Sequence, residues 1–297
     1  MMRIEHLTKS FGRGPAVVND VSFTVRPGTV TGFLGPNGAG KSTTLRMLTG
    51  LTRPNAGRAT IDGIRYSDLP NPGRVVGVML DAAAQHAGRT GRETVRLAAS
   101  LLGVSEQQAD ATIERVGLSA AAGRRVGGYS LGMRQRLGLA VALLGDPLAL
   151  ILDEPANGLD PEGIRWMREL LRGFADAGGT VLLSSHLLHE VEATADHLVV
   201  IGSGRIVADG AMAELLASSG VLVRGLDTPA LHTALTRAGL TVTPSSDALR
   251  VDATTETVGR IALAAGQVLT ELRSGDTSGL EDLFFSLTAT TDTEAAA

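Results

Sequence analysis

The chain has 297 residues, enough for one large domain or for a large domain with a small one. Its formal net charge of −4 and its pI near 5.9 exclude a general electrostatic attraction to nucleic acid or to an anionic membrane. Because the chain has no cysteine, a disulfide framework and thiolate metal sites are excluded as well.

The first half of the chain combines short strands with a glycine-rich loop. The start, "MMRIEHLTKS", lacks the apolar core of a signal peptide. Alternating apolar residues predict four strands, over 4–8, 16–25, 29–34 and 57–61. A helix is predicted from Lys41 to Leu48, and it stops at Gly50. The run "VVGVML" (75–80) is typical of a buried strand, and residues 91–145 have the 3.6-residue spacing of helices.

The second half continues the alternation of strands and helices. "LALILD" (148–153) is an apolar strand, and a helix over 161–177 begins with a proline at its first position. Three further short strands are predicted, over 180–185, 197–202 and 205–210. The most apolar stretch, Leu137–Leu152, is interrupted by an aspartate and a proline and is shorter than the ~20 residues that span a bilayer. Together these elements predict an α/β fold with a largely parallel sheet covered by helices.

The pattern changes after about Leu216. The remaining elements follow in the order βαββαβ, which is that of the split-βαβ, ferredoxin-like arrangement. A last helical piece, "GLEDLFFSLTA" (279–289), precedes a polar tail over 291–297 that we expect to be disordered. The predicted domains are 1–216, with a helical subdomain over about 82–146, and a small α/β domain over 217–290.

The loop "GPNGAGKST" matches the phosphate-binding pattern G-x-x-x-x-G-K-[ST] between a strand and a helix. Its glycines let backbone N–H groups curl around a phosphate, Lys41 can reach the β- and γ-phosphates, and the Ser42 hydroxyl can coordinate Mg²⁺. The alternative, an ordinary glycine-rich turn with a chance lysine, is disfavoured by the flanking strand and helix. The nucleotide contacts expected from this loop are Gly35, Pro36, Asn37, Gly38, Ala39, Gly40, Lys41, Ser42 and Thr43.

Two acidic residues, Asp153 and Glu154, stand at the end of the apolar strand in "LALILDEP". An aspartate there can hold Mg²⁺ through a water, and the adjacent carboxylate can polarise the water that attacks the γ-phosphate. The alternative is a solvated strand end. His186, in "SSH", ends the next strand and is predicted to contact the γ-phosphate, the alternative being a structural histidine. The predicted catalytic residues are therefore Glu154, His186 and Lys41.

Together these motifs resemble those of the nucleotide-binding subunit of an ATP-binding cassette (ABC) transporter, a P-loop NTPase, over about residues 1–215. "GPNGAGKST" matches Walker A, "LALILDEP" matches Walker B, and His186 matches the switch histidine. "NGLD" matches the D-loop, which implies a nucleotide contact for Asp160. Phe11 falls where the family places an aromatic residue that stacks on adenine, the alternative being a core phenylalanine.

The stretch "YSLGMRQ" is similar to the family signature, usually written LSGGQ. Ser130 and Gly132 are retained, whereas Leu131 replaces the first glycine and Met133 replaces the glutamine. The resemblance implies that two cassettes pair head to tail, and that Ser130 and the start of its helix close on the γ-phosphate bound by Lys41 of the other. A γ-phosphate held between the positive ends of two helices stabilises the closed dimer. This stabilisation is lost when hydrolysis removes the γ-phosphate.

One position departs from the family pattern. Members usually carry a glutamine after the strand that corresponds to "VVGVML", where it senses Mg²⁺ and contacts the membrane partner. Here Asp81 stands at that position, with Gln85 nearby, and we expect a direct or water-mediated Mg²⁺ contact from Asp81. The following stretch would face the membrane partner, although we favour a solvated helix face for its arginines, Arg89, Arg92 and Arg96.

A cassette followed by a small α/β unit and "LEDLFFSLT" resembles the ATPase subunits of bacterial drug-resistance and antibiotic exporters of the bacitracin and daunorubicin types. The resemblance implies an ATP hydrolase that binds ATP and Mg²⁺ and forms a homodimer or pairs with another cassette. It would drive a separate permease from the cytoplasmic face of the membrane and export a drug, an antibiotic or a lipid-like molecule. The alternatives are a soluble non-transport cassette ATPase and a nucleotide-dependent sensor.

Overall fold

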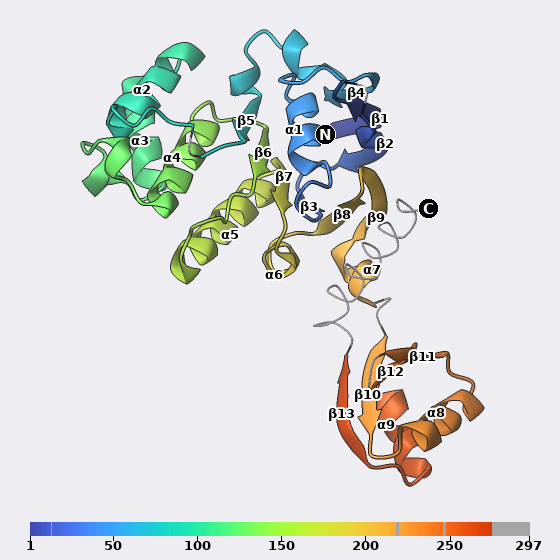
Figure 1. Ribbon diagram of the computed structural model, residues 1–297. Coiled ribbons are helices and arrows are strands. Elements are labelled where there is room, and N and C mark those ends of the chain that lie inside the picture. Colours follow the sequence, from blue (N-terminus) through green and yellow to red (C-terminus); the bar gives the residue numbers. More distant parts are fainter. Residues whose placement is uncertain (13, 83, 218–219, 246–247, 275–297) are drawn as a thin grey trace. The chain divides into compact units, whose positions relative to one another are not determined.

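The computed structural model describes the whole chain except residues 13, 83, 218–219, 246–247 and 275–297. The chain divides into two units, Met1–Asp209 and Gly210–Ala297 (Figure 1). The predicted boundary at 216 leaves helix α7 (Met212–Ala217) in the first domain, whereas this division assigns α7 to the second unit.

A six-stranded sheet forms the centre of the first unit. Its strands lie in the order β5 (Val76–Met79), β6 (Ala149–Asp153), β7 (Thr180–Ser185), β3 (Val30–Leu34), β8 (His197–Gly202) and β9 (Arg205–Ala211). The pairs from β5 through β8 are parallel. Strands β3 and β7 are buried along their whole length, which is typical of a parallel sheet with both faces covered. The predicted parallel sheet is confirmed.

A second, antiparallel sheet packs over the first, with helix α1 (Lys41–Leu48) between them. Its strands lie in the order β2 (Ala16–Val25), β1 (Met2–Ser10) and β4 (Ala56–Ile61). Leu45 and Leu48 of α1 share one buried core with residues of both sheets. In that core the rings of Phe23 and Phe33 lie 5.1 Å apart between centroids. This separate sheet is absent from the sequence-based expectation, which gave its strands but not their partners.

Helices α5 (Pro161–Asp176) and α6 (Leu188–Glu192) cover the other face of the large sheet. In β3, Phe33 faces the core around α1, whereas a Cβ at the neighbouring Gly32 would lie 2.1 Å from Cγ1 of Val191 in α6. Since successive strand residues point to opposite faces, α1 and α6 lie on opposite sides of the sheet. Helix α6, with five residues, is too short for its periodicity to have predicted it.

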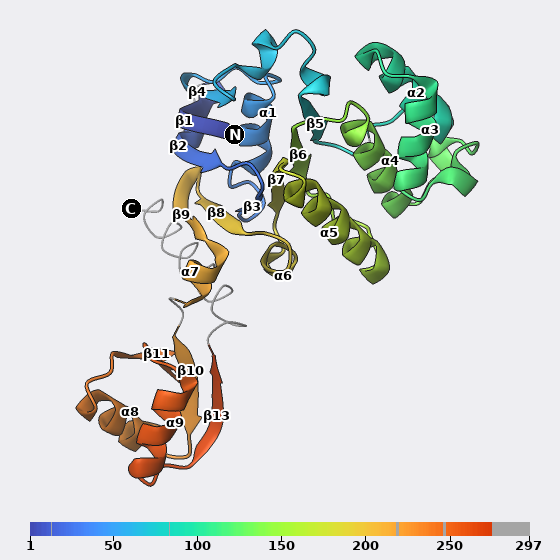
Figure 2. The ribbon, with the colours of Figure 1, turned by 180° about the vertical axis from the view of Figure 1, so that it is seen from behind.

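Three helices form a subdomain beyond β5, and they are seen there in both views (Figures 1 and 2). They are α2 (Gly91–Leu102), α3 (Glu106–Arg115) and α4 (Leu131–Leu143). Each begins at a hydroxyl residue whose oxygen accepts a backbone N–H, Thr90 for α2, Ser105 for α3 and Ser130 for α4. The predicted helical region over 91–145 is confirmed, and α4 joins it to the sheet by packing on β5.

The contact between α4 and β5 depends on Gly77. A Cβ at this position would lie 2.0 Å from the carbonyl oxygen of Ala142 in α4. We therefore expect Gly77→Ala to lower the free energy of unfolding by about 1–3 kcal/mol, because the backbone of α4 must move. Urea unfolding measures this change.

Gly173→Ala is the matched control. It lies inside α5, and a Cβ there meets no atom within 4 Å. Because alanine favours the helix over glycine, this variant should be neutral or stabilised by up to about 1 kcal/mol. Equal unfolding midpoints for the two variants would contradict the close approach at Gly77.

The second unit follows the predicted βαββαβ order. Its elements are β10 (Val221–Gly225), α8 (Thr228–Arg237), β11 (Val242–Ser245), β12 (Ala248–Val251), α9 (Thr255–Ala264) and β13 (Leu269–Ser274). The strands form an antiparallel sheet in the order β11-β12-β10-β13, and its core includes Leu231 and Leu235 of α8 and Val258 of α9. The predicted last helix and tail lie outside the described residues. Within the described residues, no helix is both long and apolar enough to cross a membrane.

Candidate active site

The phosphate-loop pattern joins β3 to α1, and close backbone contacts explain its glycines. Gly40 has φ +108°, and a Cβ there would lie 2.7 Å from the carbonyl oxygen of Val17. A Cβ at Gly35 would lie 2.5 Å from the carbonyl oxygen of Ile201. Helix α1 then begins without a capping side chain and without an acidic residue in its first turn. Its first N–H groups are therefore suited to bind an anion.

Lys41 is the first residue of α1, and only 6% of it is exposed. Its Nζ donates to the carbonyl oxygens of Gly35 at 2.6 Å and Pro36 at 3.3 Å, and it lies 3.7 Å from Oε1 of Glu154. Burial lowers the pKa of Lys41, and the negative charges of Glu154 and Asp153 oppose this shift. The two carboxylates thus favour the ammonium form that binding a phosphate requires.

The acidic end of β6 is linked to β7 through a serine. Register places Asp153 beside Ser184, and the Ser184 hydroxyl donates to Oδ1 of Asp153 and accepts the N–H of Glu154 at 3.0 Å. Nδ1 of His186 lies 2.8 Å from Oε2 of Glu154. The carboxylate of Glu154 therefore lies between His186 and Lys41, so the three residues predicted to be catalytic meet at one place.

Glu154 has an unusual backbone conformation. Its φ is +48°, although it is not a glycine and precedes Pro155, which favours extended conformations. Such a residue costs about 1–3 kcal/mol and persists only where its surroundings fix it. Here the N–H is held by Ser184, and the carbonyl oxygen accepts hydrogen bonds from the N–H of Asn157 at 3.2 Å and from Nε2 of Gln135 at 3.4 Å.

Ser184 and Gln135 bond the acidic end of β6, and the sequence motifs predicted neither contact. The signal for Ser184 was present, because parallel pairing of the two strands puts it opposite Asp153. Gln135 gave no comparable signal. It lies between two arginines in the first half of α4, and nothing local shows that it reaches the end of β6.

A pocket of about 230 Å³ opens at this loop. Its lining residues are Val17, Pro36, Asn37, Gly38, Gly40, Lys41, Ser42, Thr43 and Glu154. Most of them are predicted nucleotide contacts, whereas Gly35 and Ala39 belong to the loop without lining the pocket. The loop and the carboxylate of Glu154 thus enclose one space next to the start of α1.

Oxygen ligands that suit Mg²⁺ lie near Lys41, since Ser42 follows it in α1 and the charge of Asp153 acts on its ammonium. Ser42 is exposed at the start of α1, and Asp153 is half-buried at the end of β6. Hydroxyl and carboxylate oxygens are the donors that Mg²⁺ prefers, and the ion usually keeps several waters and binds phosphate as well. The described residues contain no group of three or more His, Cys, Asp or Glu arranged to hold a metal. The donor set fits an ion shared between protein, water and phosphate.

The signature serine lies apart from this pocket. Ser130 precedes α4, and its Oγ accepts the N–H of Met133 at 3.2 Å. The side chain is exposed, and a serine hydroxyl that accepts a hydrogen bond can still donate its proton. No residue of α4 lines the 230 Å³ pocket, and Figures 1 and 2 show α4 and α1 on opposite sides of β5.

The signature and the D-loop touch within the chain. A Cβ at Gly132 would lie 3.1 Å from the carbonyl oxygen of Gly158, and a Cβ at Gly158 would lie 2.2 Å from Cδ2 of Leu131. Asp160 caps α5, because its Oδ1 accepts the N–H of Gly163 at 2.8 Å. The replacement of the first signature glycine by Leu131 therefore adds a packing contact with the D-loop.

Phe11 follows β1 and is 57% exposed, so it is not a core residue. The Nζ of Lys9 lies 5.1 Å from the centroid of its ring. The exposed ring is available for stacking, but Phe11 does not line the 230 Å³ pocket. Its contact with adenine stays a prediction.

Asp81 lies shortly after β5 and is exposed. Because β5 and β6 are parallel, Asp81 and Asp153 follow strands that end at the same edge of the sheet. Gln85 is half-buried against α4, where its Nε2 lies 3.4 Å from the position of a Cβ at Gly138. The Mg²⁺ contact of Asp81 stays a prediction.

The arginines of α2 are used within the helical subdomain. Arg96 forms ion pairs of 2.8 Å with both Glu106 and Asp110, and Arg92 lies 3.3 Å from Asp110. The hydrogen bond from Arg96 holds the pKa of Asp110 below its usual value. Arg92 and Arg96 therefore tie α2 to α3 while staying partly exposed, and Arg89 is exposed.

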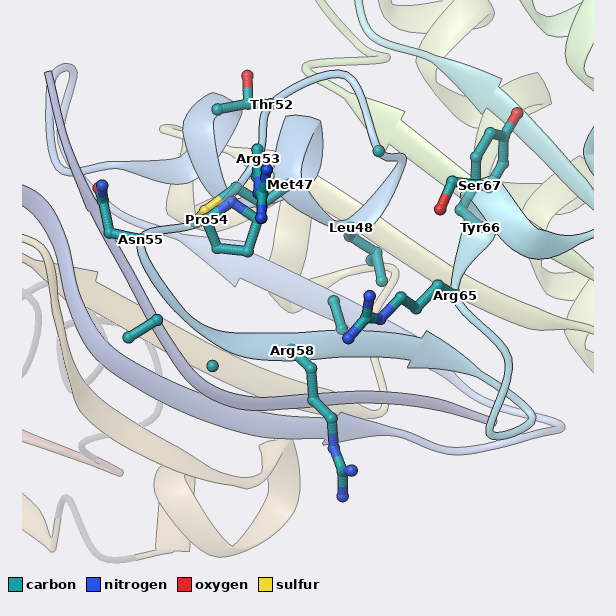
Figure 3. Close-up of a pocket in the computed structure, with 14 residues that line it drawn as sticks. Met47, Leu48, Thr52, Arg53, Pro54, Asn55, Arg58, Arg65, Tyr66 and Ser67 are labelled. Carbon is teal, nitrogen blue, oxygen red and sulfur yellow. The ribbon is translucent and has the colours of Figure 1, made fainter.

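A larger pocket, of about 440 Å³, lies between the end of α1 and β4 (Figure 3). Three arginines are among its lining residues, Arg53, Arg58 and Arg65. Arg58 is paired with Glu5, its Nε lying 2.7 Å from Oε2. None of the predicted site residues lines this pocket, so its size alone gives no reason to place the chemistry there.

Comparisons with known proteins agree with this geometry. The family model described as "ABC transporter" matches residues 18–157, and a domain of unknown function matches 219–281. The lantibiotic transport ATP-binding protein SrtF of Streptococcus pyogenes is 38% identical over 211 residues, which cover 70% of this chain and 90% of SrtF. The chain belongs to the ATP-binding subunits of ABC transporters.

Other relatives of this ABC subunit support the same branch. The bacitracin transport ATP-binding protein BcrA of Bacillus licheniformis is 40% identical over 212 residues, covering 70% of this chain and 69% of BcrA. A solved structure of an ATP-binding subunit of an ABC transporter superposes with a TM-score of 0.67 at 30% identity, covering 73% of this chain and 92% of the other. The predicted family, its antibiotic-export branch and the cassette fold are confirmed, and the subunit is an ATP hydrolase.

Proposed function

We propose that two copies of this ABC subunit close around two MgATP and drive a separate membrane permease. The observation that carries this proposal is the separation, within one chain, of the two helix starts to which we assign the γ-phosphate. Ser130 does not line the pocket at Lys41 of its own chain. It is exposed at the start of α4 and is therefore accessible to a second chain. A second copy that turns its α4 toward this pocket completes the surroundings of the γ-phosphate.

The proposed dimer opens and closes by electrostatics. The start of α1 and Lys41 bind the phosphates from one chain, and Ser130 with the start of α4 binds the γ-phosphate from the other. Cleavage removes the charge shared by the two helix starts, so the energy that closes the dimer is lost. The contact between Gly132 and the D-loop around Asp160 brings both segments to the same interface.

Within each site, we assign the hydrolysis to residues that meet in the structure. Glu154 orients and polarises the attacking water, and Lys41 and His186 hold the γ-phosphate. Ser42, and Asp153 through a water, would hold Mg²⁺, which neutralises charge on the phosphate oxygens. Ser184 fixes the pair of acids, because it bonds both Asp153 and Glu154.

The names of the relatives support a proposal for the cargo and the location. SrtF is named for lantibiotic transport and BcrA for bacitracin transport. We propose that the permease exports an antibiotic, a drug or a lipid-like molecule, and that this subunit works on the cytoplasmic face of the membrane.

Affinity purification with ATP tests the permease. We expect tagged Glu154→Gln protein, recovered from detergent-solubilised membranes, to co-elute with a protein of several membrane-spanning helices. Glu162→Gln, the same change at an exposed position outside the site, should retain less of that protein because its dimers reopen. If only soluble proteins co-elute, the transport proposal is wrong, and a non-transport cassette ATPase is left. Absence of steady-state phosphate release by the wild-type protein would instead favour the sensor.

A further inference from the structure

Gln135 is a buried polar residue in the first half of α4. Only 5% of it is exposed, and it lies among buried residues of α4 such as Leu137 and Leu139. Its Nε2 donates to the carbonyl oxygen of Glu154 at 3.4 Å, whereas its buried Oε1 has no hydrogen-bond partner among the described residues. An apolar side chain would avoid that unpaired oxygen, so packing alone does not account for a glutamine here.

The hydrogen bond from Gln135 reaches Glu154, a residue with a strained backbone conformation. Glu154 has φ +48°, and its carboxylate must stand at a defined place between Lys41 and His186. Ser184 holds the N–H of this residue from β7. Its carbonyl oxygen accepts the N–H of Asn157 in the same turn, at 3.2 Å, and in addition the amide of Gln135 from α4. Together these bonds fix the peptide groups on both sides of the strained residue, and the bond from Gln135 is the one that comes from α4.

Gln135 also stands on the helix that begins at Ser130. Ser130 caps α4, and Gln135 lies in its second turn. Two turns of one helix move together as a rigid element. A shift of the helix start therefore shifts the amide that bonds Glu154. No other described hydrogen bond links a side chain of α4 to Glu154.

We infer that Gln135 is a positioning residue that couples the signature helix to the carboxylate of Glu154 in the same chain. The inference rests on the proposed roles of Glu154 and Ser130. When Ser130 binds the nucleotide of the partner, the position of α4 is fixed. Through its hydrogen bond, Gln135 then fixes Glu154, which orients the water in the site of its own chain. Each site thereby senses whether the other holds ATP.

The first test is Gln135→Met, which keeps the length of the side chain and removes the donor. We expect kcat for ATP hydrolysis to fall by about 10- to 100-fold, because displacing a reacting group by about 1 Å has effects of this size. KM and the affinity for ATP should stay within about twofold, since Gln135 does not line the nucleotide pocket.

Gln108→Met is the matched control. Nε2 of Gln108 in α3 donates to the carbonyl oxygen of Leu144 at 3.4 Å, the same bond at the same length but outside the site. Its kcat should stay within about twofold of the wild type. An equal loss in both variants would overturn the inference in favour of a general effect on the helical subdomain.

A double variant separates positioning from other effects of the helix. If Gln135 acts through the carboxylate of Glu154, Gln135→Met should not slow the residual single-turnover hydrolysis of the Glu154→Gln protein further. A further tenfold loss or more would overturn the inference, because Gln135 would then act by another route.

Folding is checked by thermal unfolding of each variant. If Gln135→Met does not fold, Gln135→Asn, which shortens the side chain by one carbon, should show the same selective loss of kcat. Unchanged kcat in either folded variant contradicts the inference. The proposed function fails separately, if the wild-type protein itself does not release phosphate from ATP.

Discussion

Replacing Glu154 by glutamine slows steady-state ATP hydrolysis by about 10²–10⁴-fold while ATP binding persists. The amide has nearly the shape of the carboxylate but cannot accept a proton from the attacking water. The substitution also removes the negative charge next to Lys41 and His186, but it keeps a side chain of nearly the same size in the pocket. The ATP-bound dimer should accumulate, because its closed state no longer loses the γ-phosphate charge.

Phosphate release and gel filtration with ATP measure the two effects. Glu162→Gln, an exposed acid in the first turn of α5, is the control and should leave both unchanged. If the Glu154→Gln protein hydrolyses ATP at a near-normal rate, Glu154 is not the residue that orients water. If hydrolysis falls but no dimer forms, the proposed coupling of dimerisation to the γ-phosphate is wrong.

Replacing Ser130 by arginine should abolish hydrolysis and leave ATP binding to each chain intact. The long side chain fills the space where the partner's γ-phosphate would approach the start of α4. Within one chain, no pocket residue changes, because Ser130 does not line the space at Lys41. ATP affinity by fluorescence titration and phosphate release measure the two properties separately.

Ser105→Arg is a close control for the loss of the helix cap. Ser105 Oγ accepts the N–H of Gln108 at 3.2 Å, and Ser130 Oγ accepts the N–H of Met133 at the same distance. Both substitutions lose one cap, worth about 1 kcal/mol, but only one lies in the signature. The Ser105→Arg protein should hydrolyse ATP normally.

A mixing experiment decides whether Ser130 acts across the dimer. Ser130→Arg and Lys41→Met proteins should each be inactive alone. In a mixed dimer, one site has an intact Lys41 from the first chain and an intact Ser130 from the second, so hydrolysis should return in part. It should stay below half of the wild-type rate, because the other site holds no ATP for α4 of the first chain to engage. If it does not return although mixed dimers form, the assignment of Ser130 to the partner's site is wrong.

The sequence by itself determined the elements and the phosphate chemistry of this ABC subunit. Short-range periodicity gave the strands and the main helices, because burial on one face imposes a repeat of 2 or 3.6 residues on neighbouring positions. The loop from Gly35 to Thr43 could be recognised for a related reason, since its glycines, lysine and hydroxyl act within one short segment. The βαββαβ order of the second unit was also local information.

Only the tertiary structure decided which segments distant in sequence act together. One example is the separate sheet over α1, which is formed by β1, β2 and β4. Alternation along a single strand does not specify which strands pair with it. Ser184 and Gln135 bond the backbone of Glu154 although they lie 30 and 19 positions away from it in the sequence. No local sequence pattern predicts hydrogen bonds over such separations. The left-handed conformation of Glu154 is supported locally by the N–H of Asn157, which bonds its carbonyl oxygen, but the bonds from Ser184 and Gln135 form only once β7 and α4 are packed.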